Sequence, residues 1–374
     1  MTATSKAKPK ATLRSGDPLR VGREPVTYGR NVLMQNGSAF ELQHRFFVNE
    51  PWELLAEAIA RAVAPGKTRD IAQSFRRQAE DYFRAATTGR ELAVRPVLLY
   101  YAFLNLSKAY GVAKGNANLA GRAHHGITCE CKPKTIPRST IKFARGGTLV
   151  FQELLRLLDG SVVVLGSELQ LGHLLPQILP GHRLWCYATK RAERFLTVEK
   201  FDVLHVSAAK KVWLNLYLSR NDLERLGISE KRVTSQADLT EFEIADGGTD
   251  SVCFQQRNPD SYSADQAEAL VQIIRRNRNR VWETVKTGSP YRKPYIYCSP
   301  PAEQGKRLPQ MLSIYLLMFF LGSVTRYSPG DFEDLLDSKY GPFFDTFISE
   351  SPMQFLYLMA SDILGREVSK PAII

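Results

Sequence analysis

The sequence lacks the short motifs that mark the common catalytic families. No phosphate-binding loop of the form G-x-x-x-x-G-K-[ST] occurs, and no G-x-G-x-x-G follows an expected strand. The nucleophile motif G-x-S-x-G and the zinc motif H-E-x-x-H are absent as well. The glycine pairs in ARGGT and ADGGT predict turns rather than phosphate cradles. The sequence therefore does not predict an ordinary nucleotide-dependent or hydrolytic enzyme, and no cofactor is expected.

Cysteine is scarce, and no apolar run is as long as a membrane-spanning helix requires. The five cysteines are odd in number, and their spacing does not suggest a disulfide framework. The first residues carry charge but no apolar core of a signal peptide. The longest apolar stretch, 311–324, is shorter than the roughly 20 residues that a membrane-spanning helix needs. We therefore expect a cytoplasmic protein in which this stretch is a helix buried on all sides, and a membrane anchor is the remote alternative.

Positive charge exceeds negative charge. The chain has 50 Lys and Arg against 38 Asp and Glu, a formal net charge of +12. A basic balance favours anionic partners such as nucleic acid, whereas simple solubility is the alternative explanation. Part of the excess lies in residues 1–24, which are rich in Lys, Ser and Pro and have no periodicity. This composition predicts a basic mobile arm.

The hydrophobic periodicity predicts an α+β fold. Helical spacing dominates residues 25–139 and 261–374, whereas residues 140–260 contain alternating, strand-like segments. We expect the helices of the N- and C-terminal regions to pack into one bundle, with the β-containing middle region set against it. The segment RPVLLYYAFLNLSKAYGV is apolar on most sides and should lie at the centre of that bundle.

The stretch RAHHGITCEC, from Arg122 to Cys131, gathers two histidines and two cysteines. All four are zinc-type ligands, but their spacing does not match the separated ligand pairs of structural zinc sites, so no metal is expected. A second interpretation is acid–base chemistry by His124 or His125, with Arg122 binding a phosphate. A third is a tight turn at a helix end, in which Gly126 supplies a positive φ.

Two further groups of basic residues are candidates for anion binding. Arg326 ends the apolar helix and either forms a salt bridge with the next acidic residues or holds an anion in the same pocket as His125. The second group follows an expected helix over 263–286 and the loop after it. It consists of Arg275, Arg276, Arg278, Arg280, Arg292 and Lys293. Neighbouring tyrosines could stack on nucleic-acid bases, whereas a solvated helix face is the alternative.

Four segments in order resemble the YaaC-like family of bacterial proteins. They are RPVLLYYAFLNLSKAYGV, the HGI at 125–127, HLLPQILP and MLSIYLLMFFLGSVTRYSP. The resemblance covers most of the chain after about residue 50 and rests on the order and spacing of all four segments. It implies helical ends and a β-containing middle, and it brings no established activity.

The helix ending in LSKA before a downstream His-Gly is also similar to HEPN domains, which include many RNases of toxin and phage-defence systems. In those RNases an Arg precedes a His by four to six residues. Here Arg122 precedes His124 by two residues and His125 by three, so the motif is not met. RNase activity is therefore not carried over from this likeness.

Three functional hypotheses follow. The first is a cytoplasmic accessory protein that binds nucleic acid or a protein partner, with a phage-defence context suggested only by the HEPN likeness. The second is a metal-independent RNase or phosphodiesterase that uses His124 or His125 with Arg122 and Arg326. The third is a structural subunit or homo-oligomer whose apolar helices pack against another chain.

Overall fold

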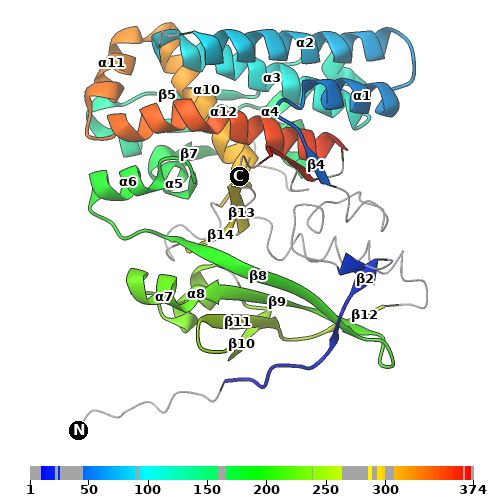
Figure 1. Cartoon of the computed structure of the whole chain (residues 1–374). Coiled ribbons are helices and arrows are strands. Elements are labelled where there is room, and N and C mark those ends of the chain that lie inside the picture. The colour runs from blue at the N-terminus through cyan, green and yellow to red at the C-terminus, as the bar shows by residue number, and fades with distance from the viewer. Residues whose placement is uncertain are drawn as a thin grey trace. The chain divides into compact units, whose positions relative to one another are not determined.

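The chain forms two compact units in the computed structural model. The structure describes residues 10–21, 24–25, 45–89, 92–158, 166–237, 239–262, 285–288, 293–299, 307–364 and 367–371. Unit 1 comprises Met1–Gln43, Arg194–Val285 and Lys293–Pro301, and unit 2 comprises His44–Glu193, Lys286–Arg292 and Ala302–Ile374. Each unit contains helices and strands (Figure 1), so the predicted α+β class is confirmed.

The helices of unit 2 come from distant parts of the sequence. They are α1 (Trp52–Ala62), α2 (Lys67–Thr88), α3 (Arg95–Ala113), α4 (Val150–Leu158), α5 (Leu171–Leu174), α6 (His182–Thr189), α10 (Gln310–Tyr327), α11 (Pro329–Asp337) and α12 (Gly341–Leu364). Short 3-10 turns at Leu92–Val94, Ala117–Ala120, Pro133–Arg138 and Leu175–Gln177 join them. In Figure 1, α2 and α10 lie against α3, which is in contact with both.

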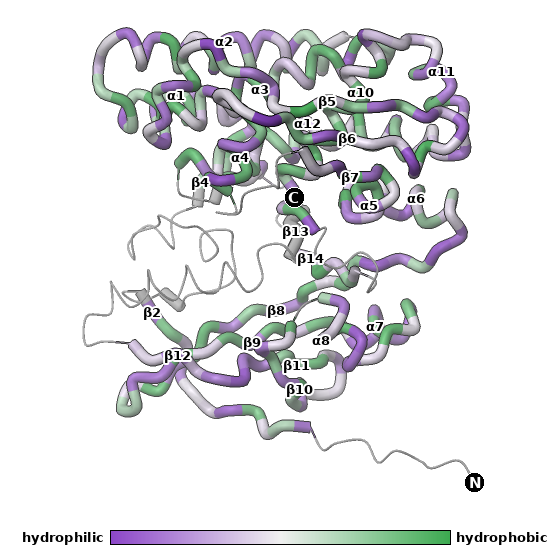
Figure 2. Tube along the Cα trace, turned by 180° about the vertical axis from the view of Figure 1, so that it is seen from behind, coloured by the Kyte–Doolittle hydropathy of each residue, from purple (hydrophilic) through white to green (hydrophobic). Residues whose placement is uncertain are grey.

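Helices α3 and α10 are buried around most of their circumference. The apolar residues between Met311 and Val324 are all buried, as expected for this stretch. By contrast, α2 is amphipathic, and its hydrophilic and hydrophobic residues alternate along the tube in Figure 2. Such an alternation lets one helix face cover the core while the other meets water. Among the described residues, no helix combines the length and apolarity that crossing a membrane would require.

Helix α12 is longer than the sequence predicts. The sequence pattern predicts a helix over 351–364 only. Pro352 lacks the N–H that a helix interior uses, so a helix that continues through it is unexpected. The structure continues the helix through Pro352 from Gly341 to Leu364. Phe344 and Phe347, in the turns before the proline, are fully buried. Their packing explains why the helix extends past a residue that normally ends one.

Two small sheets complete unit 2. Strands β5 (Ile127–Glu130), β6 (Thr140–Phe143) and β7 (Glu168–Gln170) form an antiparallel sheet, in which Ile127 pairs with Phe143. Strands β4 (Arg45–Phe47) and β15 (Glu367–Ser369) form a parallel pair. The three-stranded sheet is important below, because β5 begins just after His124, His125 and Gly126.

Unit 1 is built on an antiparallel sheet. Its strands are β1 (Asp17–Pro18), β8 (Phe195–Val206), β9 (Lys211–Ser219), β10 (Phe242–Asp246), β11 (Ser251–Gln256), β12 (Asp260–Ser261) and β14 (Lys293–Tyr297). The central order is β10-β11-β9-β8-β14. Helices α7 (Arg220–Leu226) and α8 (Glu230–Gln236) supply Leu223 and Val233 to the core under this sheet. Strands β2 (Arg20–Val21) and β3 (Glu24–Pro25) form a separate pair, and β13 (Val285–Gly288) lies where the chain passes between the units.

Residues 10–21 differ from the mobile arm that their composition predicts. The N–H of Leu19 donates to the Val203 carbonyl at 2.8 Å, and the Leu19 side chain is only 4% exposed. Arg14 donates to the Glu243 carboxylate at 2.7 Å and to the Gln256 carbonyl. One apolar anchor and one multiply bonded arginine thus hold the segment on the sheet, and composition alone does not reveal such contacts.

The division between the units falls at Arg194, inside the 140–260 segment for which the sequence predicts a β-containing region. The expected helix over 263–286 lies outside the described residues as far as 284, and Val285 and Lys286 belong to β13.

Candidate functional site

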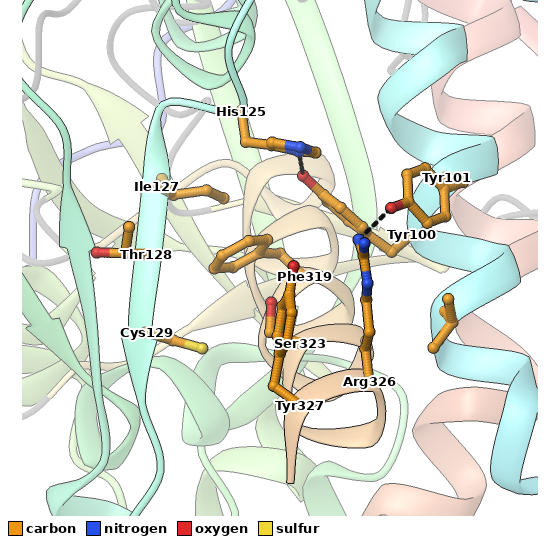
Figure 3. A pocket seen from close by; sticks show the side chains of 12 residues that line it. Tyr100, Tyr101, His125, Ile127, Thr128, Cys129, Phe319, Ser323, Arg326 and Tyr327 are labelled. Carbon is orange, nitrogen blue, oxygen red and sulfur yellow. Dashed lines mark hydrogen bonds between the residues drawn. The ribbon is translucent and has the colours of Figure 1, made fainter. Parts of the chain in front are cut away.

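A cavity of about 270 Å³ opens in unit 2 where α3, α10 and β5 meet. Its lining consists of Val97, Tyr100 and Tyr101 from α3, His125, Ile127, Thr128 and Cys129 from β5 and the turn before it, and Phe319, Gly322, Ser323, Arg326 and Tyr327 from α10. Figure 3 shows these side chains around the space that they enclose. We call this cavity the His125–Arg326 pocket, and it unites the two residues that the sequence suggested as neighbours.

The two helices meet closely because Gly322 has no side chain. A Cβ at this position would lie 2.9 Å from the Pro96 carbonyl oxygen and 3.1 Å from the Tyr100 Cβ. The small residue therefore lets α10 approach the first turns of α3. This approach places Ser323 and Arg326, on the last turns of α10, beside the tyrosines of α3.

The turn before β5 is fixed by the start of α4. The N–H groups of Val150 and Phe151 donate to the carbonyls of His124 and His125 at 3.0 and 3.3 Å. The first N–H groups of a helix have no partner within the helix, so these carbonyls satisfy them. Gly126 has a φ of +83°. The predicted turn with a positive φ is thus confirmed. Its carbonyls accept hydrogen bonds from the start of α4, however, and not from the end of α3.

His125 is coupled to Tyr100 on the pocket wall. The Tyr100 hydroxyl and His125 Nδ1 form a hydrogen bond, and the two rings stack at 5.5 Å with 29° between their planes. His125 is exposed, but the protein around it desolvates its imidazole and, together with the positive charges of Lys108 and Arg326, lowers the pKa of the ring. His125 is therefore neutral at neutral pH, and one of its two ring nitrogens carries a proton.

The hydrogen bond with the Tyr100 phenol is compatible with a proton on either nitrogen. Burial strongly raises the pKa of Tyr100, so its hydroxyl keeps its proton. The Tyr315 hydroxyl is a second hydrogen-bonding neighbour of this phenol, so the phenol either donates to Nδ1 or accepts from it. When the phenol donates to Nδ1, Nε2 carries the imidazole proton and acts as a donor. That tautomer favours holding an acceptor, such as an anionic oxygen, over removing a proton from one.

Arg326 is exposed at the end of α10, although the helix itself is buried. Its guanidinium donates to the Tyr101 hydroxyl and lies 4.9 Å from the Tyr327 ring centroid. Figure 3 shows this hydrogen-bonded pair next to that of Tyr100 and His125. None of the carboxylates described in the structure forms a salt bridge with Arg326, so the alternative of a bridge to Asp331, Glu333 or Asp334 is wrong.

The remaining polar groups of the pocket are neutral. Burial raises the pKa of the Cys129 thiol, and a hydrogen bond from Ser323 opposes this rise. Burial also raises the pKa of Cys131, just outside the pocket, to about 12. No Asp or Glu lies among the described residues that line the pocket. Its ionisable character is therefore cationic, from Arg326 at the wall and Lys108 nearby.

The zinc alternative for His124, His125, Cys129 and Cys131 is not supported. In the described part of the chain, which includes all four, no three His, Cys, Asp or Glu side chains are grouped so that they could hold a metal ion. His125 and Cys129 line the pocket, whereas His124 and Cys131 do not.

The other predicted site residues are not brought to this pocket. Arg122 and His124 are exposed and do not line it. Arg275, Arg276, Arg278, Arg280 and Arg292 lie outside the described residues, and Lys293 is the first residue of β14. The arginine-rich segment therefore stays a prediction.

The sequence interpretation missed the tyrosines of α3. Tyr100 and Tyr101 orient His125 and Arg326, but they lie inside an apolar stretch that reads as pure core. The available signal is the pair of adjacent phenols in an otherwise apolar helix. Buried hydroxyls need hydrogen-bond partners, so such a pair indicates polar groups facing the helix.

The fold and the site thus define an α+β protein of two units with a cationic, carboxylate-lacking pocket in the second. The sequence profile of the YaaC-like Protein family matches residues 39–363. The chain belongs to the YaaC-like family, as the order of its four segments suggested. Comparison with curated proteins gave no match, and comparison with solved structures gave none either. The likeness to HEPN domains finds no support in these comparisons.

Proposed function

We propose that this protein binds single-stranded nucleic acid and that the His125–Arg326 pocket holds one phosphate group of the strand. The observation that carries the proposal is the exposed Arg326 guanidinium beside a cavity with no carboxylate among its described lining. An arginine without an acidic partner attracts an anion, and its planar fork matches phosphate oxygens. In the tautomer with the proton on Nε2, the neutral His125 adds a second donor.

The aromatic side chains favour a nucleic-acid ligand over a bare ion. Tyr327 is 71% exposed, and the Arg326 guanidinium lies over its ring. Exposed aromatic rings next to phosphate-binding cations are the usual platform for bases of single strands. The cavity volume of about 270 Å³ suits a phosphate with its sugar better than a large cofactor. The net charge of +12 supports the same class of partner.

The proposal is tested by fluorescence anisotropy with end-labelled single-stranded RNA and DNA at two salt concentrations. Replacing Arg326 by Gln should weaken binding by about ten- to a hundredfold, because a charged hydrogen bond contributes about 1.5–3 kcal/mol. The slope of log affinity against log salt should fall by about 0.7 for one lost phosphate contact. Arg122→Gln is the matched control, since Arg122 is exposed and outside the pocket. Equal affinities of the wild type and Arg326→Gln would contradict the proposal.

A second candidate function is metal-independent cleavage of a phosphodiester. His125, neutral near pH 7 and close to Arg326, is the observation in its favour. Cleavage would require the other tautomer, in which Nε2 lacks a proton and serves as the base. EDTA-resistant cleavage that disappears in His125→Asn, with an unchanged melting temperature, would place this function first. Retention without cleavage supports binding, and the absence of both leaves a protein partner as the remaining hypothesis.

A further inference from the structure

Unit 2 contains a second, larger cavity of about 580 Å³ that the proposed function does not use. It lies among the start of α1, the end of α2, the start of α3 and the middle of α12, whose positions Figure 1 shows. No residue that lines it also lines the His125–Arg326 pocket. Its volume falls in the range of small-molecule sites, about 300–1,000 Å³.

The inner wall of this cavity is aliphatic. Leu99, Ile348 and Leu356 line it, and each is almost completely buried. The aromatic residues of the wall are engaged with each other, since Trp52 packs edge-on against Phe83 at 5.5 Å. The wall favours a flexible hydrocarbon chain, whose burial contributes about 0.8 kcal/mol for each methylene.

Cationic groups lie at the same cavity. Arg95 donates to the Gly89 carbonyl at 2.9 Å, and its Nε is buried without a hydrogen-bond partner among the described residues. Lys370 also lines the cavity. Within the described residues, neither side chain forms a salt bridge. Arg84 differs, because Glu50 and Glu80 neutralise it at 2.6 and 2.8 Å.

Arg95 and Lys370 line the cavity without a neutralising carboxylate among the described residues, so an anionic oxygen in the cavity would be a favourable partner for their charges. We propose that this cavity binds a single-chain amphiphile with an anionic head group. Its hydrocarbon chain lies along Leu99, Ile348 and Leu356, and its carboxylate or phosphate head accepts hydrogen bonds from Arg95 and Lys370. The proposal is independent of the nucleic-acid proposal, because the two cavities have separate linings.

The test is isothermal titration of the full-length protein with decanoate, decyl phosphate and decanol, each below its micelle-forming concentration. Saturable binding of decanoate or decyl phosphate, at least tenfold tighter than decanol, is expected. The tighter of the two anions identifies the head group. Arg95→Gln should weaken binding of the anion about tenfold and leave decanol unaffected. Arg77→Gln, on the exposed side of α2, is the matched control and should bind as the wild type does.

Two more variants keep the test decisive if Arg95→Gln folds poorly. Lys370→Gln should also weaken binding of the anions. Ala86→Leu should prevent binding of both anions, because the larger side chain would occupy space at the buried wall of the cavity. Arg326→Gln should leave decanoate affinity unchanged, which separates this site from the nucleic-acid pocket. Equal affinity for decanoate and decanol, no saturable binding of any probe, or unchanged affinity in folded Arg95→Gln and Lys370→Gln would overturn the proposal.

Discussion

At the scale of single residues, the pocket depends on how two tyrosine hydroxyls orient an imidazole and a guanidinium. Tyr100 fixes the ring of His125, and Tyr101 fixes the guanidinium of Arg326. Desolvation by the surrounding protein, together with neighbouring cations, lowers the pKa of His125, so its neutral form is favoured in the folded protein. In the unfolded chain the same imidazole is solvated and has an ordinary pKa near 6.5. The difference links protonation of His125 to folding.

This linkage predicts a pH dependence of stability. Because the folded-state pKa of His125 is lowered, the unfolded state takes up the proton first as the pH falls. The stability that the neutral ring contributes is complete above about pH 7. It is lost as the pH falls through about 6.5 toward the lowered folded-state pKa. Urea unfolding between about pH 7.5 and 5 should therefore show a steeper loss of unfolding free energy for the wild type than for His125→Asn.

Parallel pH profiles of the two proteins would count against the assigned environment of His125. The comparison cancels the titration of the other five histidines, which are common to both proteins. A steeper profile for His125→Asn would reverse the sign and would mean that the folded state stabilises the charged ring.

The residue scale also shows what one sequence can and cannot reveal about the site. His125, Arg326 and the positive φ of Gly126 could be predicted, because clustered histidines, a charge after an apolar helix and a His-Gly turn are local signals. The partner of Arg326 could not, since Tyr101 and Arg326 are 225 positions apart. A contact over that distance is determined by tertiary packing, which no local pattern encodes.

At the scale of elements, the pocket exists because α3 and α10 approach closely at Gly322. This approach predicts that Gly322→Ala is destabilising. Alanine would improve helix propensity by about 1 kcal/mol, whereas overpacking against Pro96 and Tyr100 costs about 1–3 kcal/mol. The second effect should exceed the first, because a backbone oxygen lies 2.9 Å from the added Cβ. Urea unfolding measures the net loss, and weaker oligonucleotide binding should accompany it as Tyr100 shifts.

Gly330→Ala is the control for this prediction. Gly330 lies in the first turn of α11, and a Cβ there would meet no atom within 4 Å. Its replacement should leave stability unchanged or slightly raised. If both variants are equally stable, the close approach of the two helices does not constrain the pocket.

Elements were predictable where their pattern was long and regular. Helices α3 and α10 coincide with the two long apolar segments of the sequence, and the alternating segments near β8 and β9 are strands. Pro352 hid the first half of α12, because tertiary packing overrides the local cost of a proline. Residues 10–21 were missed for a related reason, since their order comes from contacts with a sheet more than 180 residues away in sequence, as in the pairing of Asp17 with His205.

At the scale of the whole molecule, the residues that the structure describes form two separate hydrophobic clusters. One contains Phe103, which stacks on Phe355 with ring centroids 3.9 Å apart, and the other contains Leu216. Chains with more than one core commonly unfold in more than one cooperative step. We therefore expect calorimetry to resolve two transitions. Phe103→Ala should lower the midpoint temperature of only one transition, and Leu216→Ala that of only the other. Each substitution should reduce the unfolding free energy of its own cluster by about 2–5 kcal/mol.

A single transition that both substitutions lower together would show that the two clusters unfold as one unit. The sequence predicted the α+β class of this molecule but gave no means of assigning core residues to two clusters. Both clusters draw on residues from distant parts of the chain.

The most direct test of the central claim is a histidine NMR titration. The protein is labelled with ¹⁵N-histidine, the His125 ring signals are assigned with His125→Asn, and a short single-stranded oligonucleotide is added. We predict an Nε2-protonated ring whose signals shift on addition in the wild type and in Arg122→Gln, and whose shift in Arg326→Gln requires at least about tenfold more oligonucleotide. A His125 ring that does not respond to a bound oligonucleotide, or responds equally in Arg326→Gln, would contradict a phosphate site in this pocket.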